Sequence, residues 1–547
     1  MSVSIKNKLN NFNSEFIFSI CLTILFVSIF YNFNFIIKVT PSDPLEYVRP
    51  AIYPQEGFPY LDRISLWYFI RFISLFGISN EYLGGVATLT QTSILLFIIL
   101  FWLSKRFDIL TASVFFFIFL LNEYWLKLAT YTYPTQLLTL ITIGSVLLVD
   151  LTKSEKIKYI ILGCATVLAI FSKVQGFGFL FFVLFMILMD QNKIIHLKYY
   201  LVGLFCFLLF FIYIIYFIDG FQMFFKLYQK YFINENFSAQ FKGRALSNFP
   251  NFLKLLEDPS IFIGFIYTFF VFFSKKLSNL KALAILAFSQ ILFLLFIYYI
   301  TKRGGPVIVN YFLEPITISL IFLAVLSSQF IKKFFFIFNY NNYFLIVIFI
   351  FFLGTFIFLV NFFYFNEISI LINNYHYNKT IVNSIAYIIL IFFLISFILK
   401  FKKQFYIMTL IIFLIILFRS SHYSIKDVKS SSNWTEPYYI ISNLIKSNFE
   451  TEKRNLIFNA ILNRSDILDA EVLIRQIAFQ IFELNQNELY MYWCKGFSCN
   501  HNLPNTSIIT DDLQYIDSLK KENFVASVLI NKIDNMTLSK TLYLLKN

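Results

Sequence analysis

Charged residues are scarce in this 547-residue sequence: only 14% of positions are Asp, Glu, Lys or Arg, whereas 58% are hydrophobic and 21% aromatic. The mean hydropathy is +0.70. So little charge excludes a single soluble domain, because the apolar side chains exceed what one water-soluble core can hide. We therefore predict an α-helical polytopic membrane protein.

Cysteine and histidine are also few, with five and four residues. Three cysteines lie inside apolar runs, where a thiol behaves as a small hydrophobic group. Cys494 and Cys499 lie in a polar tail, and a lone His501 does not supply the second pair that a zinc site requires. We therefore favour a disulfide loop between Cys494 and Cys499, if the tail lies outside the cytoplasm, over a metal pair.

The formal charge of +14 comes from short Lys and Arg clusters between apolar runs. Such clusters are typical of topology signals, so we predict no nucleic-acid partner. One span needs about 20 apolar residues to cross the bilayer core, so the apolar runs of this chain predict twelve to fourteen spans. Thirteen candidate runs are present, at 16–37, 86–103, 109–122, 134–150, 157–172, 174–189, 198–218, 259–274, 281–300, 306–327, 343–365, 380–399 and 404–419.

A cytoplasmic amino terminus makes every second connection short and basic, as the positive-inside rule requires. Those connections contain Lys105-Arg106, Lys153/Lys156/Lys158, Lys193/Lys198, Lys275-Lys276/Lys281, Lys332-Lys333 and Lys400/Lys402/Lys403. The other connections, which include 38–85 and 219–258, are longer and mixed in sign. We expect a bacterial plasma membrane, with these longer connections and the carboxyl terminus outside.

The chain changes character after Arg419, which predicts two domains, 1–419 in the membrane and 420–547 outside it. In the second, strand-like runs at 455–459, 489–493 and 524–530 alternate with helix-like stretches. We predict a small soluble α/β domain.

The first long connection contains Ser42-Asp-Pro-Leu-Glu-Tyr-Val-Arg-Pro-Ala51, then Gly57-Phe-Pro-Tyr-Leu-Asp-Arg-Ile-Ser-Leu-Trp-Tyr68 and Leu75-Phe-Gly77. This order resembles the first outer loop of GT-C glycosyltransferases, especially the branch with bacterial aminoarabinose transferases and protein O-mannosyltransferases. In that branch an Asp, a nearby Tyr and a Pro-Tyr segment precede an aromatic helix that ends in Phe-Gly. Many relatives place Asp and Glu side by side, whereas Pro44 and Leu45 separate Asp43 from Glu46 here.

Three later segments are similar to that family in the same order: Tyr131-Thr-Tyr-Pro-Thr-Gln136, Phe171-Ser-Lys-Val-Gln-Gly-Phe177, and Lys302-Arg303 with Asn310-Tyr-Phe-Leu-Glu-Pro315. The resemblance covers most of the chain. It implies a membrane enzyme that moves a sugar from a polyprenyl-phosphate donor to a lipid, glycan or protein acceptor, in the cell envelope.

The chemistry of such a transfer assigns roles to the residues. Asp43 is the expected base for the acceptor hydroxyl in an inverting transfer, with Glu46 as a second catalytic candidate. Cations stabilise the leaving phosphate, and Arg suits it because of its forked donors. A divalent metal near Asp43 stays open, since relatives divide on metal need. The substrate-binding candidates are Tyr47, Arg49, Glu123, Tyr133, Lys173, Arg244, Lys302, Arg303 and Tyr311.

Each candidate also has a structural reading. Asp43 is placed to cap a short helix, and Glu46 to pair with Arg49. Lys173 could snorkel to the membrane interface, and Arg303 could be an ordinary loop charge. The connection 219–258 reads as a donor-binding lid or as a helix lying in the interface.

Two other functional classes remain as alternatives. One is a polysaccharide polymerase or a transporter of lipid-linked oligosaccharide, and the other is a non-catalytic membrane scaffold. A transporter should show internal repeats and ionisable residues within spans. We find neither clearly, because the charges lie in connections.

Overall fold

The structure is a computed structural model. It describes residues 2–32, 35–36, 38, 47–48, 51, 63–217, 259–273, 278–295, 309–337, 439, 455–459, 491–493, 506–510, 513–521, 524–533 and 536–546.

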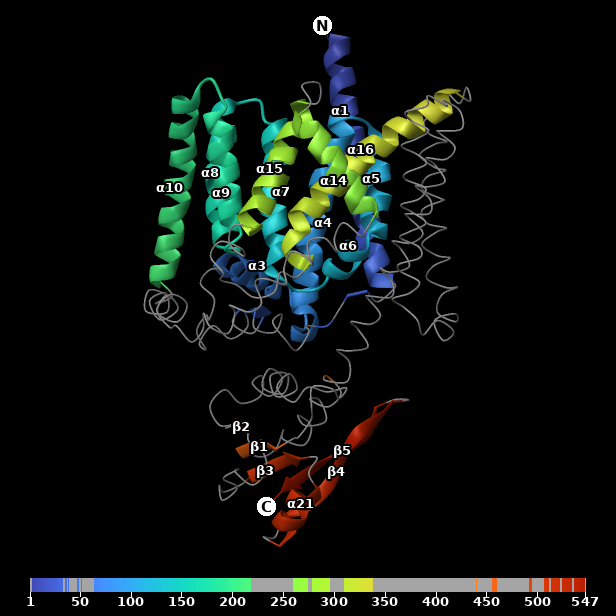
Figure 1. Ribbon diagram of the computed structural model, residues 1–547, viewed down its shortest axis with the longest axis vertical. Coiled ribbons are helices and arrows are strands. Elements are labelled where there is room, and N and C mark those ends of the chain that lie inside the picture. Colours follow the sequence, from blue (N-terminus) through green and yellow to red (C-terminus); the bar gives the residue numbers. More distant parts are fainter. Residues whose placement is uncertain are drawn as a thin grey trace.

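A bundle of helices makes up most of the described chain (Figure 1). Its helices are α1 (Ser2–Asn32), α3 (Ile64–Ser74), α4 (Asn80–Arg106), α5 (Ile109–Leu121), α6 (Glu123–Leu128), α7 (Pro134–Leu151), α8 (Glu155–Ile170), α9 (Gly176–Leu188), α10 (Lys193–Phe217), α14 (Pro259–Phe273), α15 (Ser278–Leu295), the 3-10 turn η6 (Val309–Phe312) and α16 (Leu313–Ile337).

Helices lie at ten of the thirteen predicted spans. The predicted spans at 343–365, 380–399 and 404–419 lie outside the described residues. Within the described part of the chain, five helices, α1, α4, α7, α10 and α16, are long and apolar enough to cross a membrane. The chain is therefore an integral membrane protein with several spans.

Local sequence sets several helix boundaries. Asp108 caps α5, because its carboxylate accepts a hydrogen bond of 2.8 Å from the Thr111 N–H. Pro134 opens α7, where its missing N–H leaves no helical bond unmade. Gly77 takes a φ of 71° just after α3, which explains why the aromatic helix ends in Phe-Gly.

Burial separates inner helices from lipid-facing ones. Every residue of α5 from Leu110 to Leu121 is buried, and 83% of the α16 span is buried. Only 17% of the α10 span is buried, so most of its apolar surface is left for lipid. Helix α10 packs closely on α8: a Cβ on Gly163 would lie 2.3 Å from the Tyr200 carbonyl oxygen, and one on Gly203 2.2 Å from that of Ile160.

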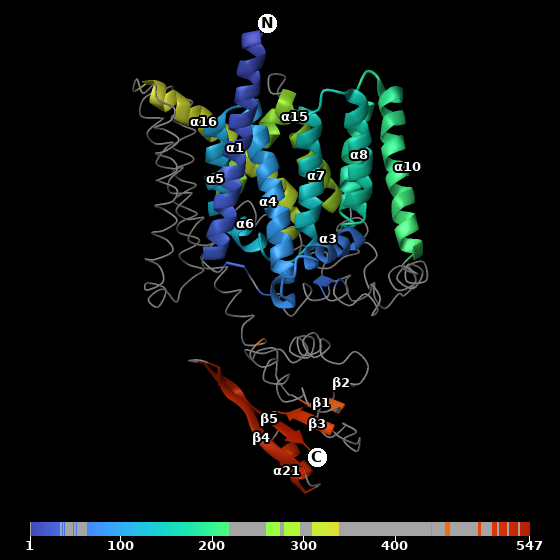
Figure 2. The same cartoon turned by 180° about the vertical axis from the view of Figure 1, so that it is seen from behind.

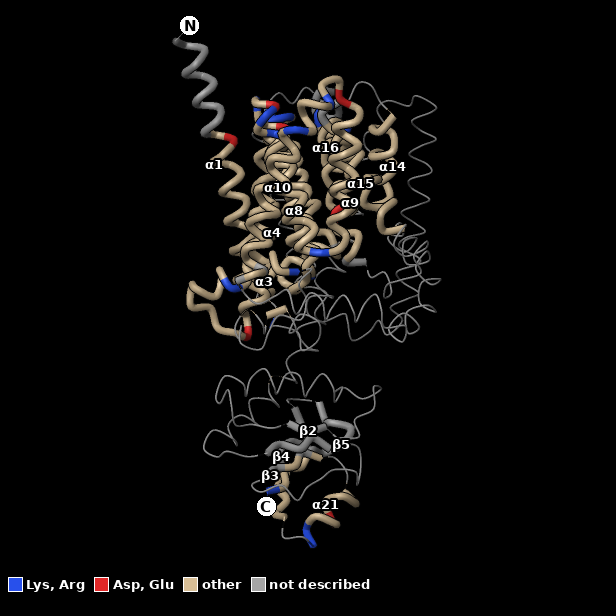
Figure 3. Tube along the Cα trace, turned by 90° about the vertical axis from the view of Figure 1, so that its left-hand side faces the viewer, with Lys and Arg blue, Asp and Glu red and all other residues tan. Residues whose placement is uncertain are grey.

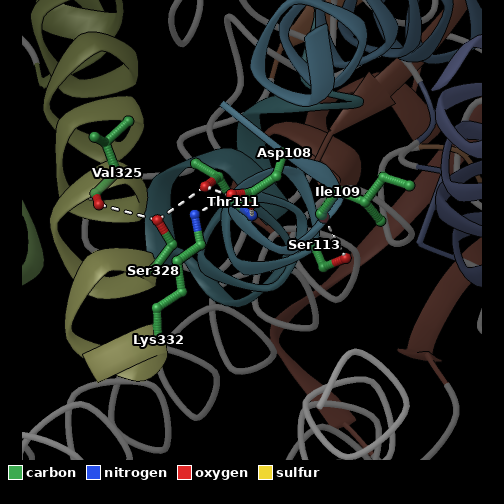
Figure 4. A network of polar contacts seen from close by, with 7 residues as sticks. All are labelled: Asp108, Ile109, Thr111, Ser113, Val325, Ser328 and Lys332. Carbon is green, nitrogen blue, oxygen red and sulfur yellow. Dashed lines mark hydrogen bonds and ion pairs between the residues drawn. The ribbon is translucent and has the colours of Figure 1, made fainter. Parts of the chain in front are cut away.

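Many of the Lys and Arg residues lie at the end of the bundle where the amino terminus lies (Figure 3). We call this the basic end; α4, α7 and α9 end there. Arg106 pairs with Asp150 at 2.7 Å, joining α4 to α7. Asp108, Thr111, Ser328 and Lys332 form a second network that joins α5 to α16, in which the Lys332 ammonium pairs with the Asp108 carboxylate (Figure 4).

The opposite end of the bundle carries α3, α6 and the turn between α8 and α9 (Figures 1 and 2). Tyr47, Val48 and Ala51 of the first long connection are buried there, against α3, α4 and α7. We call this the loop end. It brings together the segments on which the family resemblance depends.

The described part of the tail forms a five-stranded sheet beyond the loop end (Figure 1). Strands β2, β1 and β3 are parallel, and β5 runs antiparallel to both β3 and β4, in the order β2-β1-β3-β5-β4. Helix α21 packs on the sheet through Tyr515, Ile516 and Leu519. The element bounds are β1 (Asn455–Asn459), β2 (Met491–Trp493), β3 (Thr506–Thr510), α21 (Leu513–Lys520), β4 (Val525–Ile533) and β5 (Met536–Lys546).

Strands are present at the three predicted positions. A soluble α/β domain outside the membrane stays a prediction. The division of the chain at residue 420 stays a prediction. Cys494 and Cys499, and with them the predicted disulfide, lie outside the described residues.

Candidate functional site

A buried lysine forms the centre of the candidate site at the loop end. Lys173 is only 5% exposed, and its Nζ donates a hydrogen bond of 2.8 Å to Thr135 Oγ1 at the start of α7. The ammonium lies 3.7 Å from the ring centroid of Tyr311 and 5.3 Å from that of Tyr133. Both distances suit cation–π attraction, which is strongest where water is excluded.

The turn between α8 and α9 holds this lysine in place. The N–H groups of Ser172 and Lys173 both donate to the Ala169 carbonyl at 3.1 Å, and Gly176 N–H donates to the Lys173 carbonyl at 2.8 Å. The turn is also tied to α3, since Ser65 N–H donates to the Phe171 carbonyl at 3.1 Å. Lys173 therefore lies on a backbone fixed from both sides.

Aromatic rings continue the site toward the first long connection. The Tyr47 ring meets the Tyr133 ring edge-on, with centroids 5.9 Å apart, and the Tyr131 ring stacks on Tyr133 at 6.1 Å. Arg63 donates a hydrogen bond of 2.7 Å to the Tyr47 hydroxyl and lies 4.8 Å from its ring centroid. Lys173, Arg63 and the tyrosines Tyr47, Tyr131, Tyr133 and Tyr311 thus lie together at the loop end.

A carboxyl group lies deeper in the bundle, below these rings. Glu314, in the first turn of α16, is fully buried and accepts a hydrogen bond of 3.3 Å from Thr142 Oγ1 on α7. Our expectation that the charges lie in connections is therefore wrong for Glu314, which lies within the predicted span 306–327.

The structure brings together four of the predicted substrate-binding residues, Tyr47, Tyr133, Lys173 and Tyr311. Glu123 begins α6, but its side chain lies outside the described part of the structure. The other predicted site residues also lie outside it: Asp43, Glu46, Arg49, Arg244, Lys302 and Arg303.

Four residues of this site were not among the predicted site residues: Arg63, Tyr131, Thr135 and Glu314. All lie inside the segments that carry the family resemblance, but the site residues predicted in those segments were other members of the motifs. Glu314 had a usable signal, because a carboxylate inside an apolar run is costly and usually functional. The contact between Lys173 and Thr135 had none, since 38 residues separate them.

Among the described residues, no group of three or more His, Cys, Asp or Glu side chains could hold a metal ion. Asp43 and Glu46 lie outside the described residues, so the question of a divalent metal near Asp43 stays open. The described residues could hold an anion instead, because Lys173 and Arg63 are cationic and the tyrosines offer hydroxyl groups.

The helical bundle, with its polar site at the loop end and a sheet beyond it, shares its fold with a protein of known structure. A crystal structure of ArnT from Cupriavidus metallidurans bound to undecaprenyl phosphate is similar to this chain, with a TM-score of 0.55 over 95% of this chain and 97% of that one. ArnT in its apo state aligns with a TM-score of 0.49. Identity is 12% in both alignments, so the likeness concerns the fold alone. No protein-family model and no curated protein sequence matches the chain.

Proposed function

We propose that this protein is a membrane glycosyltransferase that moves a sugar from a polyprenyl-phosphate donor to an acceptor at the loop end of the bundle. The observation that carries the proposal is the buried ammonium of Lys173 between Thr135, Tyr133 and Tyr311. A buried charge is costly, and a lysine with no task in the site would extend to water. Lys173 instead reaches inward, to Thr135.

The fold supports the donor class. The similar ArnT structure holds undecaprenyl phosphate, a lipid with one phosphate group. A phosphate that leaves the sugar gathers negative charge, and a cation in a poorly hydrated site stabilises that charge strongly. We assign this role to Lys173, with Lys302, Arg303 and Arg244 as further cations.

We assign the base to Asp43, four residues before the buried Tyr47. In this reaction the acceptor hydroxyl loses its proton to Asp43 as its oxygen bonds to the anomeric carbon. The bond from that carbon to the donor phosphate breaks on the opposite face, and polyprenyl phosphate leaves with the electron pair. This displacement inverts the anomeric centre.

We further propose that the loop end faces the outside of the cell. Helix ends rich in Lys and Arg favour the cytoplasmic side, and many of the described Lys and Arg lie at the basic end (Figure 3). The loop end, the donor site and the tail would then all be extracytoplasmic.

Binding of undecaprenyl phosphate to the purified protein tests the site directly. We expect Lys173→Met to weaken binding by roughly thirtyfold or more, because it removes a buried cation that pairs with the phosphate. Lys198→Met is a matched control, since Lys198 is exposed near the start of α10 at the basic end. Equal affinities of Lys173→Met and the wild type would overturn the donor site.

The activity is tested separately with Asp43→Asn. We expect this variant to bind undecaprenyl phosphate normally but to transfer no sugar, which mass spectrometry of membrane lipids and glycans can detect. Near-normal glycan products in cells that make Asp43→Asn would remove Asp43 as the base.

A further inference from the structure

Two buried glutamines, one in the turn that holds Lys173 and one on α15, are polar residues that the proposed reaction does not use. Gln175 follows Lys173 by two residues and is 1% exposed, and Gln290 is fully buried. The nitrogen and the oxygen of both amides lack a hydrogen-bond partner among the described residues. An unmet buried polar group costs about 1–3 kcal/mol, so two such amides destabilise the fold unless a polar partner meets them.

Both amides belong to the first turn of α9. Gly178 N–H donates to the Gln175 carbonyl at 2.9 Å, and residues three apart lie on the same side of a helix. A Cβ on Gly178 would lie 2.6 Å from Gln290 Oε1, closer than real Cβ contacts. The Gln290 amide therefore packs on the backbone of the turn that begins at Gln175, in space that glycine leaves open because it has no Cβ.

The backbone of this turn has no donors left for the amides. The first three N–H groups of α9 donate to the carbonyls three residues before them: Gly176 to Lys173, Phe177 to Val174 and Gly178 to Gln175. Side chains of α9 cannot bind the amides either, because all of them are apolar. The hydrogen-bonding capacity of Gln175 and Gln290 is therefore left for a ligand.

The chemistry of an amide selects the kind of ligand. Each amide offers donors and an acceptor without charge, which matches a sugar hydroxyl that both donates and accepts. The phosphate of the donor offers acceptors alone and suits the ammonium of Lys173. In a polyprenyl-phosphate donor the sugar is bonded to the phosphate, so a phosphate at Lys173 brings the sugar close to Gln175 in the same turn.

We propose that Gln175 and Gln290 form the donor-sugar subsite, in which their amides hydrogen-bond the hydroxyl groups of the sugar while Lys173 binds the phosphate. This inference rests on the proposed function and deepens it, because it places the sugar beside the first turn of α9 and makes its hydroxyl groups the feature that is recognised. Neither glutamine takes part in breaking or making bonds.

Binding to the purified protein compares undecaprenyl phosphate with undecaprenyl phosphate that carries glucose, galactose or mannose. We expect the wild type to bind at least one of the three sugar lipids roughly tenfold more tightly than undecaprenyl phosphate. Gln175→Leu and Gln290→Leu should each reduce this sugar advantage roughly fivefold, because hydrogen bonds are lost, and leave the affinity for undecaprenyl phosphate unchanged. No sugar advantage in the wild type, or a full advantage in both variants, would overturn the inference.

Thermal stability without a donor separates binding from structure. Replacing an unpaired buried amide by an apolar group of similar shape is neutral or stabilising, so both leucine variants should unfold at or above the wild-type temperature. A purely structural role of the amides would lower the unfolding temperature and weaken binding of all four lipids. This result would overturn the inference.

Gln91→Leu on α4 is the matched control. Gln91 is also fully buried, and its amide has no hydrogen-bond partner within the described part of the chain. We expect this variant to keep the sugar advantage of the wild type. An equal loss in Gln91→Leu would contradict the inference, because the effect would not be specific to the first turn of α9.

Gly178→Ala tests the position of the Gln290 amide without removing it, and it replaces the leucine variants if they do not insert into membranes. The new Cβ would collide with Gln290 Oε1, which ends a flexible side chain, so the amide must turn away. We expect the sugar advantage to fall as in Gln290→Leu, with unchanged affinity for undecaprenyl phosphate. Wild-type sugar binding in Gly178→Ala would count against the subsite.

Lys173→Met distinguishes failure of the subsite from failure of the proposed function. If this variant binds undecaprenyl phosphate as tightly as the wild type, the proposed donor site fails. If it loses binding while the leucine variants keep the full sugar advantage, only the sugar subsite fails.

Discussion

Gly176→Ala is a sharp test of the site, because it changes one methyl group next to Lys173. Gly176 opens α9, and a Cβ at this position would lie 2.2 Å from the carbonyl carbon and oxygen of Ala169 at the end of α8. These are backbone atoms, so no side chain can turn away. Ordinary contacts begin at 3.4 Å, so the two helix ends must separate by about 1.2 Å to admit the methyl group.

The same displacement reaches the site lysine, which lies in the turn between these two helix ends. The Lys173–Thr135 hydrogen bond is 2.8 Å, and a shift of that size would break it. Overpacking of this kind costs about 1–3 kcal/mol of stability. Misplacing a binding group by about 1 Å can cost up to a hundredfold in function. We therefore expect Gly176→Ala to lose roughly tenfold to a hundredfold in affinity for undecaprenyl phosphate.

The assay measures the thermal midpoint in detergent and the affinity for undecaprenyl phosphate on the same sample. Gly144→Ala is the matched control: a Cβ there would lie 3.4 Å from Ile98 Cδ1, which is an ordinary contact with a side chain. Alanine also favours a helix interior by up to about 1 kcal/mol, so this control should be as stable as the wild type or more so. Wild-type stability and affinity in Gly176→Ala would refute the reasoning.

Two other predictions concern the tail and the topology. Tyr439 is fully buried, and the Lys38 ammonium lies 5.0 Å from its ring centroid and 3.6 Å from Glu81. Tyr439→Leu should therefore weaken the attachment of the tail by about 0.5–2 kcal/mol and speed limited proteolysis of the tail. Tyr439→Phe keeps the ring and should not change the cleavage rate. Equal cleavage rates in these two variants would exclude the cation–π contact. An alkaline phosphatase fused after Lys446 should be active, because we place the tail outside the cytoplasm. A reporter fused at the same position that is active only in the cytoplasm would reverse the topology.

Helix positions were predictable from the sequence because apolar length is a direct signature of a membrane span. Helix ends were harder. Helix α1 begins at Ser2, well before the predicted residue 16, because a helix continues through polar residues that a hydropathy pattern does not count. Helix α16 begins at Leu313 instead of 306, after the 3-10 turn that contains Tyr311.

The candidate site was predictable in its members but not in its contacts. Tyr133, Lys173 and Tyr311 were chosen from separate segments, and only the packing of α7, α9 and α16 shows that the two rings flank one ammonium. Glu314 was missed because the residues around it were assigned to a family motif, and because the charges of the chain were expected to lie in the connections between spans. The roles of Asp43 and the other candidates outside the described residues stay predictions.

The distribution of buried polar residues bears on the choice between an enzyme and a transporter. In α4, α7 and α16 the buried polar residues toward the loop end include Gln91, Thr142 and Glu314, whereas those toward the basic end are the serines Ser104, Ser145, Ser327 and Ser328. Beyond Gln91, Thr142 and Glu314 lies a layer of large apolar side chains that belong to the main core of the bundle: Leu95, Leu96, Ile99, Leu100, Val146, Leu147, Leu320, Ile321, Phe322 and Leu323.

A transporter needs ionisable or polar groups along a path that reaches both sides of the membrane. In the described part of the bundle a column of buried threonines on α7, Thr135, Thr139 and Thr142, runs inward from Lys173 to Glu314 and then meets this apolar layer. A column closed at one end suits a site that works on one face, because its charges can act on a phosphate there while the layer beneath excludes water and keeps their interaction strong. The arrangement of these three helices thus favours transfer at the loop end over transport through the bundle.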